Sequence, residues 1–265
     1  MIKYIYWLRR EIGSFLRIKG TRISKSQWRT FFATLKPIKT EYDLRRIGAE
    51  NDGGYLVPNI LDKIEICISP GVSDIFEFEK ELLDKYQIRS ILIDGSVDHP
   101  IGLPSEMTFI KKFLGTQNDE SSIDLNYLLK KYTTKKESSV LLQMDIEGFE
   151  LPILRSISRN ALNIFGIMVI EFHELHNWKN KTFFNQIINP LFSELSNLFY
   201  IVHLHPNNCD GLFRNAFFGK KFPMSLEVTF VNKKLIKMPG AVAGIPHKLD
   251  KPNSLALPDI SVVFD

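Results

Sequence analysis

Short apolar segments alternate with amphipathic segments along most of the chain. The apolar runs predict strands over residues 64–69, 89–93, 107–113, 139–144, 165–172, 200–205 and 226–231. Apolar residues spaced three and four apart predict helices over 75–86, 122–132, 151–162 and 182–198, and Pro190 is a candidate break in the last one. This alternation predicts an α/β protein with a mostly parallel sheet. Since the strands lack a clean polar alternation, we expect helices on both faces of the sheet.

A shorter region precedes this alternation. Residues 25–60 are expected to hold a helix over 27–35, then the strong turn signal Asn51-Asp52-Gly53-Gly54, then a short strand over 55–57.

Composition limits the class of protein. The chain has 265 residues, 44% hydrophobic and 24% charged, which fits one large globular domain and excludes a disordered chain or a coiled coil. The longest apolar run, 164–170, is too short to span a membrane. Two cysteines exclude a disulfide framework or a cysteine zinc site. Without a recognisable cleaved signal peptide, we expect a cytoplasmic protein.

Positive charge is concentrated at the N-terminus. The net charge is +4, but the first 25 residues contribute +6 and the remainder −2. Residues 1–20 predict a basic amphipathic helix that either packs on its own domain or docks residues 1–25 on a membrane surface or partner. Because the body is slightly acidic, we expect no nucleic-acid partner. The sequence carries no signal for an oligomeric state.

Residues that follow the predicted strands are candidates for a ligand site, because ligands of open α/β sheets bind at the carboxyl ends of the strands. Gly71 follows the first of them, and Asp94 ends the second, 23 positions later. A glycine turn with an acidic residue about 20 positions on predicts a ligand that carries a ribose. The alternative is an ordinary turn at each position.

Carboxylates and histidines cluster at later strand ends. Asp145 and Glu147 would share one side if their strand extends that far, and Glu171 and His173 alternate onto one face. Paired carboxylates are costly without a cation, a proton or a positively charged ligand. A general base or polyol contacts are the favoured interpretation. A divalent metal held by these four residues and His205 is the alternative, as is a helix-capping role for Glu147.

Several motifs together resemble the FkbM-like family of class I S-adenosylmethionine-dependent methyltransferases over residues 45–265. They are Asn51-Asp52-Gly53-Gly54-Tyr55, the Gly71 turn with Phe78-Glu79, Leu92-Ile93-Asp94, Met144-Asp145-Ile146-Glu147-Gly148, Glu171-Phe172-His173 and His205-Pro206-Asn207-Asn208. Leu249-Asp250-Lys251-Pro252-Asn253 also looks familial. The chain thus divides into a basic segment, 1–44, and a methyltransferase domain, 45–265.

The resemblance implies a Rossmann-like fold with a seven-stranded sheet, and S-adenosylmethionine as cofactor. It implies that Gly71 faces the methionine part, that Asp94 binds the ribose and that Asp145 lies near the sulfonium. The remaining cofactor-binding residues that we expect are Gly53, Gly54, Tyr55 and Ser73. The usual glycine-rich motif is reduced here to Gly71 after Pro70.

Related members act on hydroxyls, so the resemblance implies O-methylation of a sugar or glycan in the assembly of a surface polysaccharide or related glycoconjugate. We expect His173 to act as base, with Asp145 and Glu171 orienting it or the acceptor. Glu147, His205 and Asn208 would contact the acceptor, and no residue is assigned as a metal ligand. The alternatives are a metal-dependent hydrolase that uses the Asp/Glu/His cluster and a non-catalytic Rossmann-like binding module.

Overall fold

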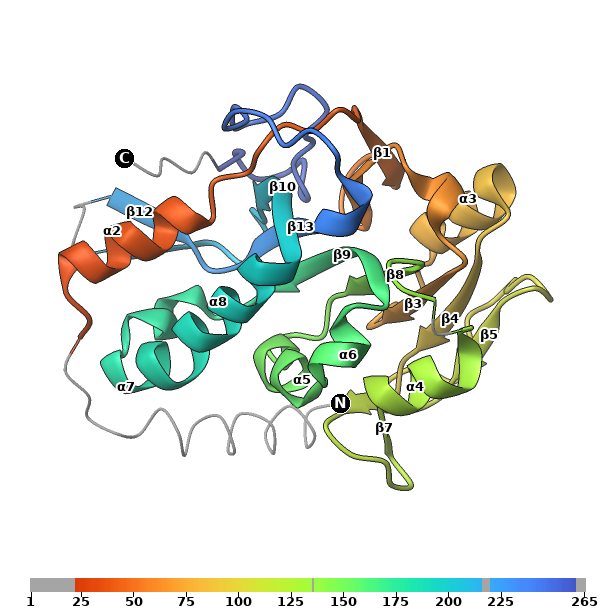
Figure 1. Cartoon of the computed structure of the whole chain (residues 1–265). Helices are drawn as coiled ribbons and strands as arrows, with labels where there is room; N and C mark the ends of the chain where they lie inside the picture. Colours follow the sequence, from red (N-terminus) through yellow and green to blue (C-terminus); the bar gives the residue numbers. More distant parts are fainter. Residues whose placement is uncertain (1–21, 135, 216–219, 261–265) are drawn as a thin grey trace.

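The computed structural model describes residues 22–134, 136–215 and 220–260. A seven-stranded sheet forms its centre, in the order β10-β13-β9-β8-β3-β4-β5. The strands are β10 (Phe199–Pro206), β13 (Leu226–Asn232), β9 (Phe165–Phe172), β8 (Val140–Met144), β3 (Ile66–Pro70), β4 (Arg89–Ile93) and β5 (Thr108–Ile110). Only β13 runs antiparallel to its neighbours (Figure 1). The predicted Rossmann-like α/β fold is therefore confirmed.

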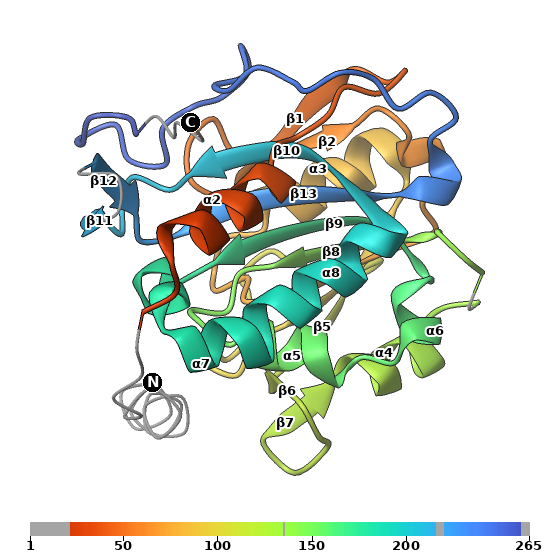
Figure 2. The same ribbon diagram turned by 60° about the vertical axis from the view of Figure 1, so that its left-hand side comes forward.

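Helices cover one face of this sheet (Figure 2). They are α2 (Lys25–Thr34), α4 (Leu125–Tyr132), α5 (Glu150–Ser156), α6 (Arg159–Leu162), α7 (Lys181–Phe183) and α8 (Asn189–Leu198). Successive strand residues point to opposite faces, so Ile66 and Ile68 join the core under these helices while Cys67 joins the core on the other face. Burial on both faces explains why the strands read as apolar runs.

The other face is covered by α3 (Glu77–Tyr86) and by a two-stranded antiparallel sheet of β1 (Leu44–Gly48) and β2 (Gly54–Pro58). The predicted turn at residues 51–54 joins these two strands. The Thr229 hydroxyl of β13 donates to the Leu56 carbonyl at 2.7 Å, which fixes β2 over the central sheet. Strand β2 is thus held against the face of β13.

Two predicted helices differ from the structure. The predicted helix over 151–162 is two helices, because Ile157 is extended and Ser158 caps α6 through its side chain. The predicted helix over 122–132 begins only at Leu125. Residues Ser122–Asp124 form β7, which pairs with β6 (Phe113–Gly115), and Asp124 caps α4.

Pro190 does not break the last predicted helix. It lies in the first turn of α8, where a missing N–H costs little, and a π-helical turn (Phe184–Ile188) connects α7 to α8. The sequence did not predict β1, nor the hairpin of β11 (Leu212–Asn215) and β12 (Lys220–Pro223). Short 3₁₀ turns at Leu61–Lys63, Leu175–Lys179 and Lys233–Leu235 complete the elements.

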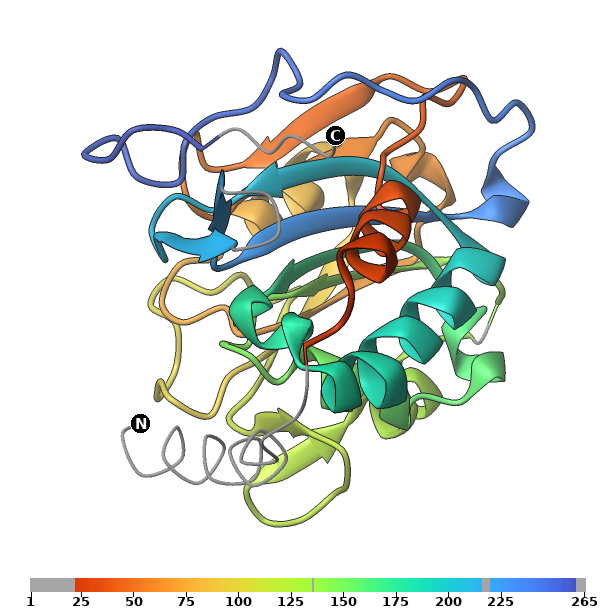
Figure 3. The ribbon, with the colours of Figure 1, turned by 90° about the vertical axis from the view of Figure 1, so that its left-hand side faces the viewer.

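The segments that flank the sheet lie against it. Trp28, Phe31 and Phe32 of α2 are buried in the main core. Figure 3 shows the segment after β13 running past β1 and β10 on its way to the C-terminus, and Ile38 bridges to Val242 of that segment. The predicted helix over 1–20 lies outside the described residues. Among the described helices, none has the length and apolar character to cross a membrane.

Candidate active site

The Gly71 turn lies against the end of β8. Gly71 has a φ of +87°, and its N–H donates to the Ile93 carbonyl at 2.9 Å. A Cβ at this position would lie 1.6 Å from the Asp145 carbonyl oxygen. Only glycine fits, because both the backbone conformation and the close approach exclude a side chain. The turn therefore sets the distance between the ends of β3 and β8.

Asp94 lies beside this turn, as the spacing predicted. One carboxylate oxygen accepts the Ser73 N–H at 2.9 Å, and the other accepts the N–H and hydroxyl of Ser96 at 2.6 and 2.5 Å. The side chain is buried, so these bonds fix its orientation. Asp94 presents an acceptor group at the rim of the Gly71 turn, which suits ribose hydroxyls.

A cavity of about 90 Å³ opens between β2 and the Gly71 turn. Of the predicted cofactor residues, it is lined by Gly53, Tyr55, Gly71, Ser73 and Asp145. Gly54 does not line it. A Cβ on Gly54 would lie 1.9 Å from the Ala49 carbonyl oxygen, so this glycine serves the β1–β2 turn. We call this space the smaller cavity.

A buried polar chain that the sequence did not predict runs below the smaller cavity. The Ser69 hydroxyl contacts Glu79 and lies 2.6 Å from Gln143 Oε1, and Gln143 Nε2 donates to the Tyr55 hydroxyl at 3.2 Å. Burial raises the pKa of Glu79 to about 7, although its bond with Ser69 lowers it. Ser69 has one proton for two acceptor oxygens, so a proton on Glu79 completes the chain.

His173 is surrounded by carboxylates from four segments. Its Nδ1 lies 2.9 Å from Glu150 Oε1, and its Nε2 lies 3.6 Å from both Asp145 Oδ1 and Glu171 Oε1. Glu147 Oε2 and Asp210 Oδ2 follow at 3.8 Å from Nε2. The structure thus brings Asp145, Glu147, Glu171 and His173 together, as predicted, and adds Glu150 and Asp210. We call these six residues the His173 cluster.

Glu147 lies in this cluster, as we had expected, although the strand does not extend to it. Strand β8 ends at Met144, and Glu147 adopts a left-handed conformation with a φ of +59° in the turn that follows. Its side chain is 78% exposed at the rim. Glu150, not Glu147, accepts the Gly148 N–H at the start of α5.

The cluster changes the expected protonation of its members. Burial lowers the pKa of His173, but the bond and charge of Glu150, together with Asp145 and Glu171, raise it to about 11. Burial raises the pKa of Asp145 to about 7, against the effect of His173, and burial raises that of Glu171 as well. A ring that keeps its proton at neutral pH does not accept another. The structure therefore argues against His173 as general base.

A larger cavity of about 480 Å³ lies on the far side of His173. It is lined by Thr116, Gly148, Phe149, Leu151, Pro152, Arg155, Ser156, His173, Glu174, Asn177, Trp178, Phe183 and Ile187. Asp145 lines the smaller cavity and His173 the larger one, so the Asp145–His173 pair, 3.6 Å apart, forms the wall between them.

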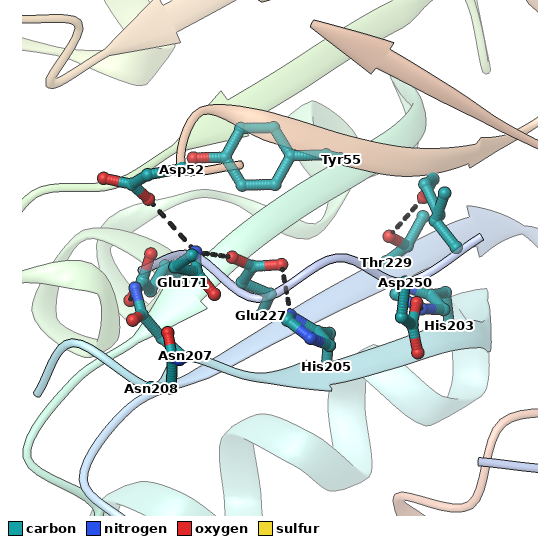
Figure 4. A network of polar contacts seen from close by, with 12 residues as sticks. Asp52, Tyr55, Glu171, His203, His205, Asn207, Asn208, Glu227, Thr229 and Asp250 are labelled. Atoms are coloured by element: carbon teal, nitrogen blue, oxygen red, sulfur yellow. Dashed lines mark hydrogen bonds and ion pairs between the residues drawn. The ribbon is translucent and has the colours of Figure 1, made fainter. Parts of the chain in front are cut away.

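A second polar network lies along β10, β13 and the C-terminal segment. Figure 4 shows Glu227 pointing toward His205, whose Nδ1 lies 3.3 Å from Glu227 Oε2. The Asn253 amide donates to Glu227 at 2.7 Å and to Asp52 at 3.0 Å. In the same network His203 Nε2 lies 2.7 Å from Asp250 Oδ1. His205 therefore contacts Glu227 of the neighbouring strand, and no contact joins it to the His173 cluster among the described residues.

Asn208 was expected to contact the methyl acceptor, but its side chain bonds the C-terminal segment of the protein instead. Its amide donates to the carbonyls of Ser254 and Leu257 at 2.9 and 3.2 Å, and it accepts the Ser254 N–H at 2.8 Å. These bonds use the side chain to fix the C-terminal segment. The neighbouring Asn207 faces the site instead, because it donates to Glu171 Oε1 at 2.8 Å (Figure 4).

The sequence analysis missed Glu150, Asn207, Asp210, Glu227 and Asn253 as members of these networks. Asn207 could have been inferred, since it alternates with His205 on the same strand end. Glu150 is the first residue of α5, where an acidic residue usually stabilises the helix N-terminus and carries no functional signal.

This fold, with a glycine turn, an acidic residue after the next strand and a carboxylate at the end of β8, defines a nucleoside-cofactor-binding Rossmann-like enzyme. A family model described as the methyltransferase FkbM domain matches residues 64–200, a little more than half of the chain. The chain belongs to this family and is an S-adenosylmethionine-dependent methyltransferase. The alternatives of a hydrolase and of a non-catalytic module are thereby set aside.

The chain is also similar to solved structures, several of which are described as methyltransferases. One is a predicted O-methyltransferase of Agrobacterium tumefaciens, with 9% identity, a TM-score of 0.34 and coverage of 66% of this chain and 79% of that one. Another is the 16S rRNA (adenine(1408)-N(1))-methyltransferase of Catenulisporales acidiphilia, with 8% identity, a TM-score of 0.31 and coverage of 80% and 93%. A third is a fibrillarin/Nop5p complex, with 9% identity, a TM-score of 0.37 and coverage of 75% and 98%. No curated protein matched the chain.

We expected that the protein has no nucleic-acid partner, and this expectation is wrong. The similar structures include enzymes named for methylation of ribosomal RNA. Our expectation was based on the charge of the whole body, and a charge summed over a domain does not describe a local surface. RNA therefore belongs among the acceptors to be tested.

The residues present fit S-adenosylmethionine. Asp145 lines the smaller cavity and places a carboxylate beside the Gly71 turn, where it would attract the positively charged sulfonium. Gly53 and Gly71 border the smaller cavity, and Asp94 lies next to Ser73 at its rim. Asp145 would lie toward the positively charged donor, and Asp94 would hold its ribose.

Proposed function

We propose that this enzyme transfers a methyl group from S-adenosylmethionine to a hydroxyl of a sugar or glycan, in the assembly of a surface polysaccharide or related glycoconjugate. The observation that carries the proposal is the shared wall between the two cavities. Asp145 lines the smaller cavity, His173 lines the larger one, and 3.6 Å separates them. A donor on one side and an acceptor on the other would meet at this pair.

The larger cavity supports a small polar acceptor. Its volume of about 480 Å³ lies within the range of small-molecule sites, roughly 300–1,000 Å³. Leu151, Pro152 and Ile187 offer apolar walls, while Arg155 and Asn177 offer polar groups. A sugar ring has apolar C–H faces and a rim of hydroxyls, so this mixture suits it.

The chain itself supplies alignment and a place for the proton. Bound S-adenosylmethionine supplies the methyl group as a sulfonium. The walls of the two cavities would hold the acceptor oxygen in line and exclude water. Asp145 is the proton acceptor best suited to neutral pH, because its pKa of about 7 lies near the working range. His173, whose Nε2 lies 3.6 Å from both Asp145 and Glu171, would hold these two carboxylates in position.

The acceptor class is tested by transfer of a radiolabelled methyl group. The full chain is incubated with labelled S-adenosylmethionine and, separately, with nucleotide sugars, oligosaccharides of surface polysaccharides and total RNA. We expect label in methyl ethers of the sugar fraction, and a loss of roughly 10²–10⁴ in rate for Asp145→Asn. Label in RNA alone would overturn the glycan proposal, and the exposed Asp84→Asn on α3 serves as control.

For localisation we propose a cytoplasmic enzyme whose residues 1–25 dock it on a membrane surface or partner. The support is their net charge of +6 together with an apolar stripe at helical spacing. Flotation with anionic liposomes compares the full chain with one lacking residues 1–20. Equal flotation of the two would contradict a membrane role for this segment.

A further inference from the structure

The two nitrogens of the His173 ring have different surroundings. On one side, Nδ1–H donates to Glu150, which is 1% exposed and is itself fixed by the Gly148 N–H at 2.9 Å. A carboxylate behind a histidine ring is the arrangement that orients metal-binding histidines, because it points Nε2 at the ion. A divalent cation at Nε2 would displace the proton that the surrounding carboxylates favour there when no ion is bound.

On the other side, Nε2 faces carboxylate oxygens at the spacing of metal ligands. Asp145 Oδ1 and Glu171 Oε1 each lie 3.6 Å away. One ligand atom from each of Asp145, Glu171 and His173 lies within 4.8 Å of the other two. Atoms that share a divalent cation at 2.1–2.6 Å lie roughly 3–4 Å apart at adjacent positions. A small closure of the three side chains would therefore coordinate one ion.

Glu171 provides an independent sign of a missing ligand. The residue is 2% exposed, and Oε1 accepts from Asn207, but Oε2 is buried with no hydrogen-bond partner among the residues that the structure describes. Asp145 Oδ1 is in the same condition. A buried carboxylate oxygen left without a partner is costly, and a cation would satisfy both.

The charge of the cluster also favours a cation. Five carboxylates face one imidazole, and within the described residues none of them forms an ion pair with a lysine or arginine. Neither Glu171 nor His173 lines the smaller cavity, so the cation that they lack is distinct from the sulfonium of the donor.

We propose that Asp145, Glu171 and His173 bind one divalent cation, with Glu147 and Asp210 at its open side. The buried carboxylate of Glu171, the half-buried carboxylate of Asp145 and one imidazole suit Mn²⁺, which accepts both oxygen and nitrogen ligands, and Mg²⁺ is the alternative with the same oxygen preference. The use of this cation rests on the proposed function: on the wall between the cavities it would contact an acceptor hydroxyl.

The test measures Mn²⁺ binding alone, with neither cofactor nor acceptor present. The full chain is treated with a chelator, dialysed and titrated with Mn²⁺, and the signal of free Mn²⁺ is followed by electron paramagnetic resonance. We expect saturation at one equivalent, and a nitrogen modulation from one imidazole in the spin-echo spectrum of the bound ion. Two results for the wild-type chain would each overturn the proposal: the chain binds no Mn²⁺, or the bound ion shows no nitrogen modulation.

Variants then assign the ligands. Glu171→Gln and His173→Gln are expected to abolish binding, and Glu150→Gln to weaken it by about 10- to 100-fold, because it only orients the ring. Asp250→Asn is the matched control, since Asp250 is a buried carboxylate paired with His203 outside the cluster. Undiminished binding by folded Glu171→Gln and His173→Gln would place the ion elsewhere. If the chain bound Mn²⁺ but transferred no methyl group, the proposed function would be overturned, while the proposed cation site would stand.

Discussion

Gly71 lies so close to Asp145 that a Cβ on the glycine would be 1.6 Å from the aspartate carbonyl oxygen. The Asp145 N–H also donates to the Pro70 carbonyl at 3.3 Å, so the ends of β3 and β8 are joined at this point. The residue that borders the cofactor cavity thus fixes the backbone of the residue that separates the two cavities. Replacement of this glycine should move Asp145.

Gly71→Ala should therefore lower the unfolding free energy by more than the positive φ at this position alone would. We expect a loss of unfolding free energy on the order of 3 kcal/mol or more, since the clash is with backbone. Gly102→Ala is the matched control, because Gly102 has a φ of +76° and open space around its Cβ, and it should lose about 1 kcal/mol. Urea unfolding measures both. Equal losses in the two variants would show that the contact with Asp145 is unimportant.

Glu79 should make the protein less stable as the pH rises. Its folded pKa of about 7 exceeds the ordinary 4.5, so the folded state holds a proton that the unfolded state releases. Stability is then full below about pH 4.5, falls as the pH rises to about 7 and stays low above it, by about 3 kcal/mol in total.

The variant Glu79→Gln should remove this slope, because the amide keeps the shape and stays neutral. Urea unfolding at pH 5, 6, 7 and 8 compares it with wild type and with Asp84→Asn, which lies exposed on the same helix. Parallel pH profiles of wild type and Glu79→Gln would contradict a protonated Glu79.

The His173 ring should remain protonated well above neutral pH in chelator-treated protein. Glu150 is the strongest of the groups that raise its pKa to about 11. NMR titration of the ring signals should show no change for His173 up to pH 9, and Glu150→Gln should move its titration to lower pH. His176 is an internal control, since burial lowers its pKa. A His173 titration near pH 6.5 would refute this account of the cluster.

Asn208→Ala should release the C-terminal segment without removing a residue from the His173 cluster. Its amide provides three of the bonds that hold Ser254 and Leu257, so we expect faster amide exchange over residues 250–258 and a loss of about 1–3 kcal/mol. Asn126→Ala is the control, because that side chain is exposed and, among the residues that the structure describes, bonds only the Ser156 carbonyl. Unchanged exchange at Ser254 would show that other contacts hold the segment.

The order of strands and helices could be predicted from the sequence because each strand is a short apolar run with a turn residue at its end. The boundaries predicted for β4 and β9 match the structure, and Asp94, Glu171 and His173 follow from the rule that strand ends converge. The pairing of β1 with β2 was missed, since Leu44–Gly48 has two adjacent arginines, Arg45 and Arg46, and no apolar run.

The chemistry of the site depends on pairs that are distant in sequence. Glu227 and Asn253 bond across 26 residues, and Asn207 bonds Glu171 across 36. No local pattern signals such pairs. The pKa of His173 is the clearest example: the sequence suggested a base, but Glu150, Asp145 and Glu171 raise the pKa of the ring to about 11. Burial and neighbours, not residue type, decide this role.

The central claim is that S-adenosylmethionine binds at the Gly71 turn and Asp94, with its sulfonium toward the smaller cavity. Isothermal titration of the full chain with S-adenosylhomocysteine tests it without knowledge of the acceptor. We predict one site in the wild type, a strong loss of affinity in Asp94→Ala and unchanged affinity in Asp98→Asn, whose side chain is 95% exposed four residues further on. No binding by the wild type, or equal affinity of Asp94→Ala and wild type, would contradict the account.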